Sequence, residues 1–276
     1  MIPALRPATA SMRRTLPGGR AVHLGFGVLL GAWIVLPLIP LMLWFVAGQW
    51  RAPDILPGTY SAQGLIELFS PQIQSATATS AALGTSVALV ATPLGLLAAL
   101  AIRRLPRTHS RFVEVVLLTP LAIPPFALVM GANVLLLRIY TPSFSAVVLV
   151  LAVAALPYTT FMFRSALASY DDRFEEVART LGANARQTLA HVRLPLLAAA
   201  TARAAFLAFL VGWGDYIATL LIGGGQLRTL PLILGSAAAG SGNEQLTAAL
   251  SLAVIGPPLV LLAALSAPRL RERIRR

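Results

Sequence analysis

The chain has 276 residues, of which 57% are hydrophobic and only 12% are charged, and its formal net charge is +12. Charged residues make up about a quarter of an average soluble domain, so this composition excludes an ordinary soluble protein. Several uncharged runs are also longer than the ~20 residues that a helix needs to cross a bilayer. The sequence therefore predicts an all-α membrane protein without a separate soluble domain.

The arginines lie in short segments between the apolar runs, on alternate sides, which is the positive-inside pattern rather than a nucleic-acid surface. There is no lysine, so the chain cannot contain a P-loop, and any ATP must bind to another chain. The absence of cysteine excludes disulfides and cysteine metal sites. The three histidines, His23, His109 and His191, are far apart in the sequence and are expected to be interfacial residues.

Residues 1–23 carry four arginines and no acid, which indicates a cytoplasmic tail. The uncharged run 24–47 is the first expected span, kinked near Pro37 and Pro40. A cleaved signal peptide is the alternative for this run, but its apolar core is longer than the 7–15 residues of a signal sequence. Residues 48–74 are polar and turn-rich, and are expected to form an external loop.

Within that loop, residues 62–69 are expected to form a short interfacial helix. The second expected span, 75–102, contains small residues such as Gly84, which let helices approach closely in lipid. The basic stretch 103–111 is then cytoplasmic. The third expected span, 113–137, contains three prolines and should be a broken or bent helix inside the bundle.

A short external turn separates the third span from the fourth, which is expected at 144–163. A polar cytoplasmic segment, 169–195, follows, and the fifth span is expected at 196–216. The sixth, 246–267, comes after an external or re-entrant stretch. Six spans place the basic ends of the chain on one side, so we expect a six-helix domain at 24–268 and a basic cytoplasmic tail at 269–276.

The 169–195 segment has the pattern of a helix, a break and a second short helix. Phe174, Val177 and Leu181 recur at helical spacing and form an apolar stripe. Glu175 and Arg179 are four residues apart and are expected to pair on the opposite face. The capping candidates are Ser169, Asp171 and Asp172 for the first helix, Gly182 for its end, and Asn184 for the second helix.

The spacing in this segment resembles the EAA loop of ABC-importer permeases. That signature is Glu-Ala-Ala, three residues, glycine, nine residues, a branched aliphatic residue, any residue and Leu-Pro. Val177 stands where the family usually has alanine, a mild change on the apolar face. The chain matches the other fixed positions with Glu176, Ala178, Gly182, Val192, Leu194 and Pro195.

The resemblance implies the type I ABC importer permease fold, with six transmembrane helices in the bacterial inner membrane and both termini in the cytoplasm. It implies three partners: a cytoplasmic ATPase dimer that holds Mg-ATP, an external substrate-binding protein, and a second permease subunit, in a heterodimer or a homodimer, of which we favour the former. This chain itself would hold no cofactor and catalyse no reaction. The expected ATPase-coupling residues are Phe174, Glu175, Glu176, Val177, Ala178, Leu181, Gly182, Ala183, Val192, Leu194 and Pro195.

Residues 212–216, followed by a glycine-rich turn and Thr-Leu-Pro, look like the polyamine, ferric-iron and thiamine branch of these permeases. An acid within a span is a functional-site hypothesis by default, so Trp213, Asp215 and Tyr216 are expected to line a pathway. Asp215 would attract a cationic substrate such as a polyamine. The alternative is that Asp215 caps the next short helix or pairs with Arg228. Ferric iron, thiamine and an oxyanion are the other candidate substrates.

Two other classes of protein compete with this interpretation. A secondary transporter or channel would need coupling-ion residues inside the spans and an inverted repeat, and neither is visible in the sequence. In a structural membrane-assembly factor, the 169–195 segment would be incidental. Copurification of an ATPase distinguishes both from an ABC permease.

Overall fold

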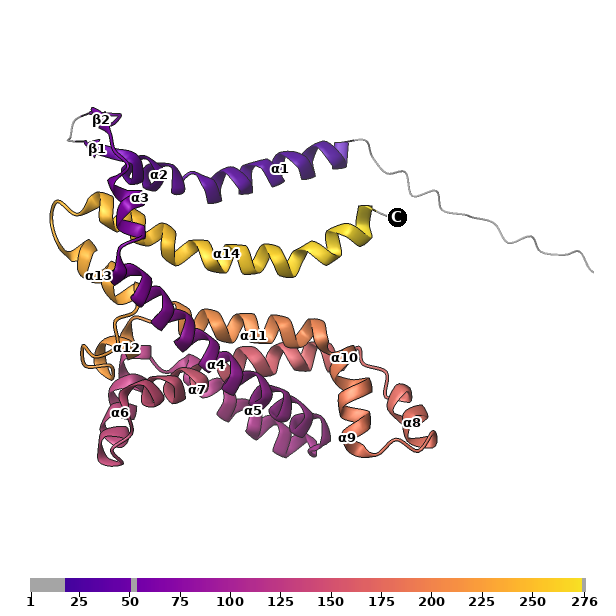
Figure 1. Cartoon of the computed structure of the whole chain (residues 1–276). Helices are drawn as coiled ribbons and strands as arrows, with labels where there is room; N and C mark the ends of the chain where they lie inside the picture. Colours follow the sequence, from indigo (N-terminus) through magenta and orange to yellow (C-terminus); the bar gives the residue numbers. More distant parts are fainter. Residues whose placement is uncertain (1–17, 51–53, 275–276) are drawn as a thin grey trace, which may run out of the picture.

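The structure is a computed structural model that describes residues 18–50 and 54–274, and it is mostly helical (Figure 1). Its longest helices are α4 (Pro71–Arg104), α7 (Ser143–Ala168) and α14 (Glu244–Ile274). The other elements outside the 169–195 segment are α1 (Gly18–Val35), α2 (Leu38–Val46), β1 (Ala47–Gln49), β2 (Thr59–Tyr60), α3 (Gln63–Leu68), α5 (Arg107–Ala122), α6 (Pro125–Arg138), α11 (Ala198–Trp213), α12 (Ile217–Leu221) and α13 (Leu230–Ala239).

Helices α4, α7 and α11 pack against one another and form the core of the molecule. Small residues line their contacts: Ala91, Ala155, Ala204 and Ala208 are fully buried. Apolar side chains gain little by leaving lipid for another apolar surface, so helices in a membrane associate where small residues permit close backbone contact. Gly84, singled out in the sequence for this reason, is buried between α4 and α11.

The six expected spans correspond to three single helices and three bent pairs. Helices α4, α7 and the 244–266 part of α14 are each long and apolar enough to cross a membrane. The pair α1 and α2 is bent by 44° at the predicted kink beside Pro37. The third pair joins the helical stretch 185–196, most of which belongs to the expected 169–195 segment, to α11 at 75°, so the bend lies at the start of the fifth expected span. The chain therefore crosses the membrane six times only if each bent pair makes a single crossing.

The third expected span differs most from its prediction. The break is where the prolines predicted it, between α5 and α6 at Ile123 and Pro124, but the two helices meet at 103°. The expectation that this helix lies inside the bundle is wrong for α5, none of whose residues is buried. Because proline removes backbone donors, the chain can turn sharply here without leaving many unsatisfied groups.

Other differences concern the ends of the chain and the external loop. The two short strands β1 and β2 pair as an antiparallel hairpin, which strands of two and three residues do not reveal by alternation. Most of the expected 1–23 tail lies outside the described residues, and α1 already begins at Gly18. The expected separate tail at 269–276 is incorrect up to residue 274, because α14 continues through it.

The start of α1, the end of α14 and the 169–195 segment lie at one end of the molecule, as Figure 1 shows. The β-hairpin, α12 and α13 lie at the other end. This arrangement agrees with an even number of crossings between the basic ends of the chain.

We predict that Gly212→Ala destabilises the protein because a Cβ atom at this position would lie 2.7 Å from the Cα atom of Gly84. Overpacking of this kind costs about 1–3 kcal/mol, which exceeds the gain of ~0.5–1 kcal/mol from replacing glycine in a helix. The matched control is Gly131→Ala in α6, where nothing lies within 4 Å of the new atom. Melting of the purified protein in detergent should fall for the first variant and not for the second; equal melting would contradict close packing at Gly212.

Candidate functional site

The 169–195 segment has the predicted order of a helix, a break and a second helical stretch. Its elements are α8 (Arg173–Thr180), α9 (Ala185–Thr188), the π-helical turn η1 (Leu189–Arg193) and α10 (Leu194–Leu196). Gly182 has a φ of +89°, the left-handed conformation that a glycine at a helix end permits. Its backbone N–H donates to the Arg179 carbonyl, 3.0 Å away, which confirms the predicted end of the helix.

The second helical stretch begins with the predicted cap. The side chain of Asn184 accepts a hydrogen bond from the backbone N–H of Gln187 at 2.9 Å, and the Gln187 side chain accepts one from the Asn184 N–H at 2.9 Å. This reciprocal capping box satisfies two backbone donors that the helix leaves unpaired. Pro195 lies in the first turn of α10, as expected.

The predicted caps of α8 are only partly correct. Asp171 accepts a hydrogen bond from the backbone N–H of Arg173 at 3.0 Å. Asp172, by contrast, makes no capping bond and forms an ion pair with Arg103 at the end of α4. The hydroxyl of Ser169 donates to the Ala166 carbonyl and so belongs to the end of α7.

The apolar stripe of α8 is exposed, at the end of the molecule where α1 starts and α14 ends. Phe174, Val177 and Leu181 are 56%, 57% and 82% exposed, although Leu181 comes one residue after α8 ends. Glu176 is also exposed. Among the other expected coupling residues, Ala178, Ala183 and Val192 are half-buried, whereas Gly182, Leu194 and Pro195 are exposed.

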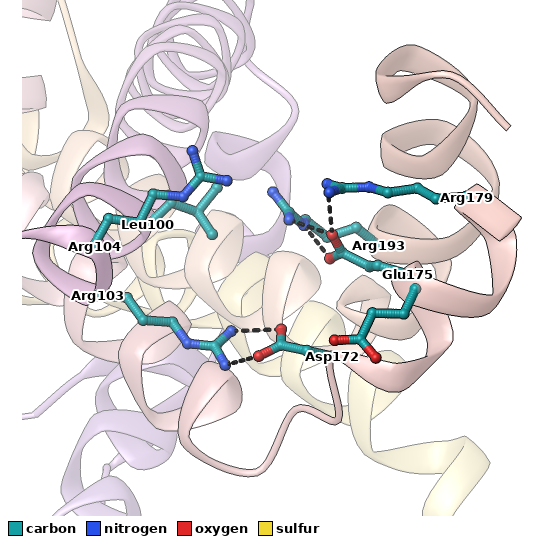
Figure 2. A pocket seen from close by; sticks show the side chains of 8 residues that line it. Leu100, Arg103, Arg104, Asp172, Glu175, Arg179 and Arg193 are labelled. Carbon is teal, nitrogen blue, oxygen red and sulfur yellow. Dashed lines mark hydrogen bonds and ion pairs between the residues drawn. The ribbon is translucent and has the colours of Figure 1, made fainter.

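Glu175 differs from its prediction. The expected pair with Arg179 on the face opposite the stripe does form, but the Glu175 carboxylate is also buried against η1 (Figure 2). It accepts two hydrogen bonds from Arg193, at 2.7 Å from Nε and 2.6 Å from Nη2, and one from the hydroxyl of Tyr170 at 2.8 Å. Arg179 approaches it only to 3.7 Å. A bidentate arginine and a third donor satisfy this carboxylate far better than an exposed i,i+4 pair could.

These contacts set the charge state of the cluster. The hydrogen bonds from Arg193 lower the pKa of Glu175, and this effect exceeds the opposing effect of burial. The same hydrogen bonds raise the pKa of Arg193. Burial, together with the bond to the carboxylate, raises the pKa of Tyr170, so its hydroxyl stays a donor. The pair is therefore ionised at neutral pH.

A cavity of about 340 Å³ separates the end of α4 from α8 and η1, as seen in Figure 2. Its lining is mostly charged, which the sequence did not suggest, because residues 100–104 are some 70 positions away from the segment. The residues that line it are Leu100, Arg103, Arg104, Asp172, Glu175, Glu176, Arg179 and Arg193.

The expected pathway residues have different positions in the structure. Trp213 lies in the core: it is 3% exposed, stacks on Phe209, and its indole N–H donates to the Val254 carbonyl at 2.8 Å. It thereby connects α11 to α14. Asp215 and Tyr216 do line a cavity, of about 520 Å³, between the α5–α6 break, α7 and α11.

Asp215 takes the capping role that the sequence left open. Its carboxylate accepts hydrogen bonds from the backbone N–H groups of Ala218 at 3.2 Å and Thr219 at 2.8 Å, and from the Thr219 hydroxyl at 2.9 Å. Both oxygens are therefore occupied at the start of α12. Within the described residues, no ion pair connects Asp215 to Arg228.

Residues 91–276, about two thirds of the chain, match the family model described as "Binding-protein-dependent transport system inner membrane component". The chain belongs to this family. A relative from Salmonella typhimurium, named "Putative 2-aminoethylphosphonate transport system permease protein PhnV", is 27% identical over 94% of this chain and 97% of its own length. Its counterpart from Salmonella typhi is 26% identical over 94% of this chain and 98% of that protein.

Solved structures of ABC importers share the fold of this permease. One is the bacterial alginate ABC transporter in complex with an alginate-pentasaccharide-bound periplasmic protein, with a TM-score of 0.60 and 14% identity over 90% of this chain and 94% of that one. Another is a bacterial ABC transporter for alginate import, with a TM-score of 0.57 and 16% identity over 93% and 98%. The expected type I importer permease fold is thereby confirmed.

Three residues that contact the acids of this segment were not indicated by the sequence patterns: Arg193, Tyr170 and Arg103. The matched region contains the whole 169–195 segment, but Arg193 occupies the motif position at which any residue is allowed. Tyr170 and Arg103 lie outside the motif altogether. An arginine directly between two apolar residues of a helical segment is the signal that could have indicated a buried partner, because burying a guanidinium requires a nearby carboxylate.

We predict that Asp215→Ala lowers the stability of this permease by about 1 kcal/mol, the usual cost of removing a helix cap. Asp215→Asn should cost less, because the amide oxygen can still accept from a backbone N–H. Thermal melting of the purified variants in detergent provides the measurement. An alanine variant as stable as the wild type would show that the three hydrogen bonds contribute nothing to the fold.

We also predict how the stability contributed by Glu175 depends on pH. Because its pKa is lower in the folded protein than its ordinary 4.5, this contribution is complete above 4.5 and is lost as the pH falls through the lowered pKa. The difference in melting temperature between the wild type and Glu175→Gln should therefore stay constant from about pH 7 to about pH 5 and shrink only below that range. A difference that already shrinks between pH 7 and pH 5 would mean a raised pKa.

Proposed function

We propose that the chain is the transmembrane permease subunit of a binding-protein-dependent ABC importer and forms half of its translocation pathway. The observation that carries this proposal is the exposed stripe of Phe174, Val177 and Leu181 on a helix anchored by the buried Glu175–Arg193 pair. Large apolar side chains exposed beside charged residues at the polar end of a membrane protein mark a protein contact. The family supports an ATPase as the partner.

The proposed complex contains a dimer of cytoplasmic ATPases, which hold Mg-ATP, a second permease subunit and an external binding protein. The 169–195 segment and both ends of the chain then face the cytoplasm of the bacterial cell. Their common position at one end of the molecule supports this orientation, and so does the arginine distribution. ATP-driven closure of the ATPases would move α8, and the helix bundle would alternate between inward and outward openings.

For the substrate, we propose 2-aminoethylphosphonate or a compound of similar chemistry. The support comes from the relatives that are named after this transport system and align over nearly the whole chain. The polyamine hypothesis depended on a free carboxylate at Asp215, and that carboxylate is occupied by three donors of α12. Of the described residues that line the 520 Å³ cavity, Asp215 is the only charged one, so the cavity offers no further attraction for a polycation.

The deciding experiment reconstitutes the permease in proteoliposomes with the second permease subunit, the ATPase and the binding protein of the proposed complex. Uptake of radiolabelled 2-aminoethylphosphonate should require ATP and should be competed by the unlabelled compound but not by putrescine or thiamine. ATP-dependent uptake of putrescine instead would overturn the substrate proposal and leave the permease role intact. Failure of any ATPase to copurify with the permease would count against the role itself.

We predict that Leu181→Asp weakens ATPase binding more than Glu176→Ala does. Leu181 is the most exposed member of the stripe, so an aspartate there would place a charge within an apolar contact. Glu176, at the edge of the stripe, is expected to set orientation more than affinity. Pull-down of the ATPase from detergent measures the order; equal capture by both variants would contradict it. Arg186→Ala, on an exposed residue away from the stripe, is the control.

A further inference from the structure

We propose that Arg193 is a positioning residue that makes α8 and η1 move as one body, so that movement of the ATPase reaches α11. This inference rests on the permease function proposed above and assigns a specific step in it to one ion pair. The position is the unspecified one in the sequence motif, and the role follows from the contacts of Arg193 rather than from the motif.

The first observation is where the pair connects the chain. Glu175 lies in the first turn of α8, and Arg193 is the last residue of η1. Two residues further on, Pro195 lies in α10, which leads directly into α11 through a bend of 75°. The capping box at Asn184 orders the start of α9, but it makes no contact with α8 in the hydrogen bonds described. The Glu175–Arg193 pair therefore closes the loop between α8 and the base of α11.

The second observation is burial. The side chains of Glu175 and Arg193 are 8% and 16% exposed, and their two hydrogen bonds are parallel. Separating α8 from η1 would leave the half-buried Arg193 without its carboxylate and Glu175 with only Tyr170 and the more distant Arg179, which is more costly than separating an exposed pair. The connection is therefore stiff. Arg193 also ends a π-helical turn, a rare geometry that is frequent at functional sites.

The third observation is a contrast with the ion pair that connects the start of α8 to α4. Asp172, just before α8, pairs with Arg103 at the end of α4, but these side chains are 55% and 38% exposed. Water and salt weaken such a pair, so it can open during a transport cycle. Thus α8 is firmly joined to α11 and loosely joined to α4. A displacement of α8 is therefore transmitted to α11 through the stiffer connection, and to α4 only through the weaker one.

The test uses the complete transporter in proteoliposomes and measures ATP hydrolysed per substrate molecule imported. The variants are Arg193→Lys, which keeps the charge but cannot form two parallel bonds, and the double variant Glu175→Gln/Arg193→Gln, which leaves no unpaired charge. The matched control is Glu114→Gln/Arg164→Gln, an ion pair of 3.0 Å between α5 and α7 outside the segment.

We expect the double variant to retain ATPase binding and to use about fivefold or more ATP per imported molecule, the lower end of typical coupling between sites. Arg193→Lys should give an intermediate ratio, and the control pair should behave as the wild type. A normal ratio in the double variant overturns the inference. If that variant does not accumulate in the membrane, a normal ratio in Arg193→Lys overturns it instead.

The outcome separates this inference from the proposed function. If the wild-type complex shows no ATP-dependent uptake, the function itself fails before any variant is compared. If the wild type transports and the Arg193 variants lose ATPase binding instead of coupling, the pair serves only to shape the docking surface, and the positioning role is refuted.

Discussion

The close contact of α4, α7 and α11 is the constraint on which the rest of this permease depends. In a membrane, burial of apolar side chains does not favour one helix arrangement over another, so the helices associate where glycine and alanine let their backbones meet. Gly84 and Gly212 provide such a contact between α4 and α11. The positions of the elements at both ends of the molecule, including the end of the 169–195 segment and the cavity beside the α5–α6 break, follow from how these three helices are oriented.

At the end of the molecule that holds the 169–195 segment, the balance between burial and hydrogen bonding decides the structure. A buried carboxylate is unfavourable unless its oxygens are fully paired, and Glu175 has three donors from Arg193 and Tyr170. The hydrogen bonds outweigh the loss of water, as the lowered pKa of Glu175 shows. Glu175, on the polar side of α8, is therefore used inside the chain, and the apolar side stays exposed. An amphipathic helix in a soluble protein normally has the opposite orientation.

Polar groups near the other end of α11 serve the fold in a similar way. Trp213 donates its indole N–H to α14, and Asp215 accepts three hydrogen bonds at the start of α12. A tryptophan or an aspartate within an apolar run of sequence suggests a substrate pathway. A buried polar group must be satisfied wherever it lies, however, and the nearest unpaired backbone donors meet that need first.

The sequence by itself determined the class of protein, the approximate positions of the spans, the helix break at Gly182 and the cap at Asn184, because each depends on local composition or on backbone geometry within a few residues. Only the tertiary structure decided which charges pair, since Glu175 and Arg193 are 18 positions apart and meet through the fold of the whole segment. The sharp angle between α5 and α6 was likewise beyond local reasoning. Prolines specify that a helix breaks, but the direction of the next helix depends on the neighbours against which it packs.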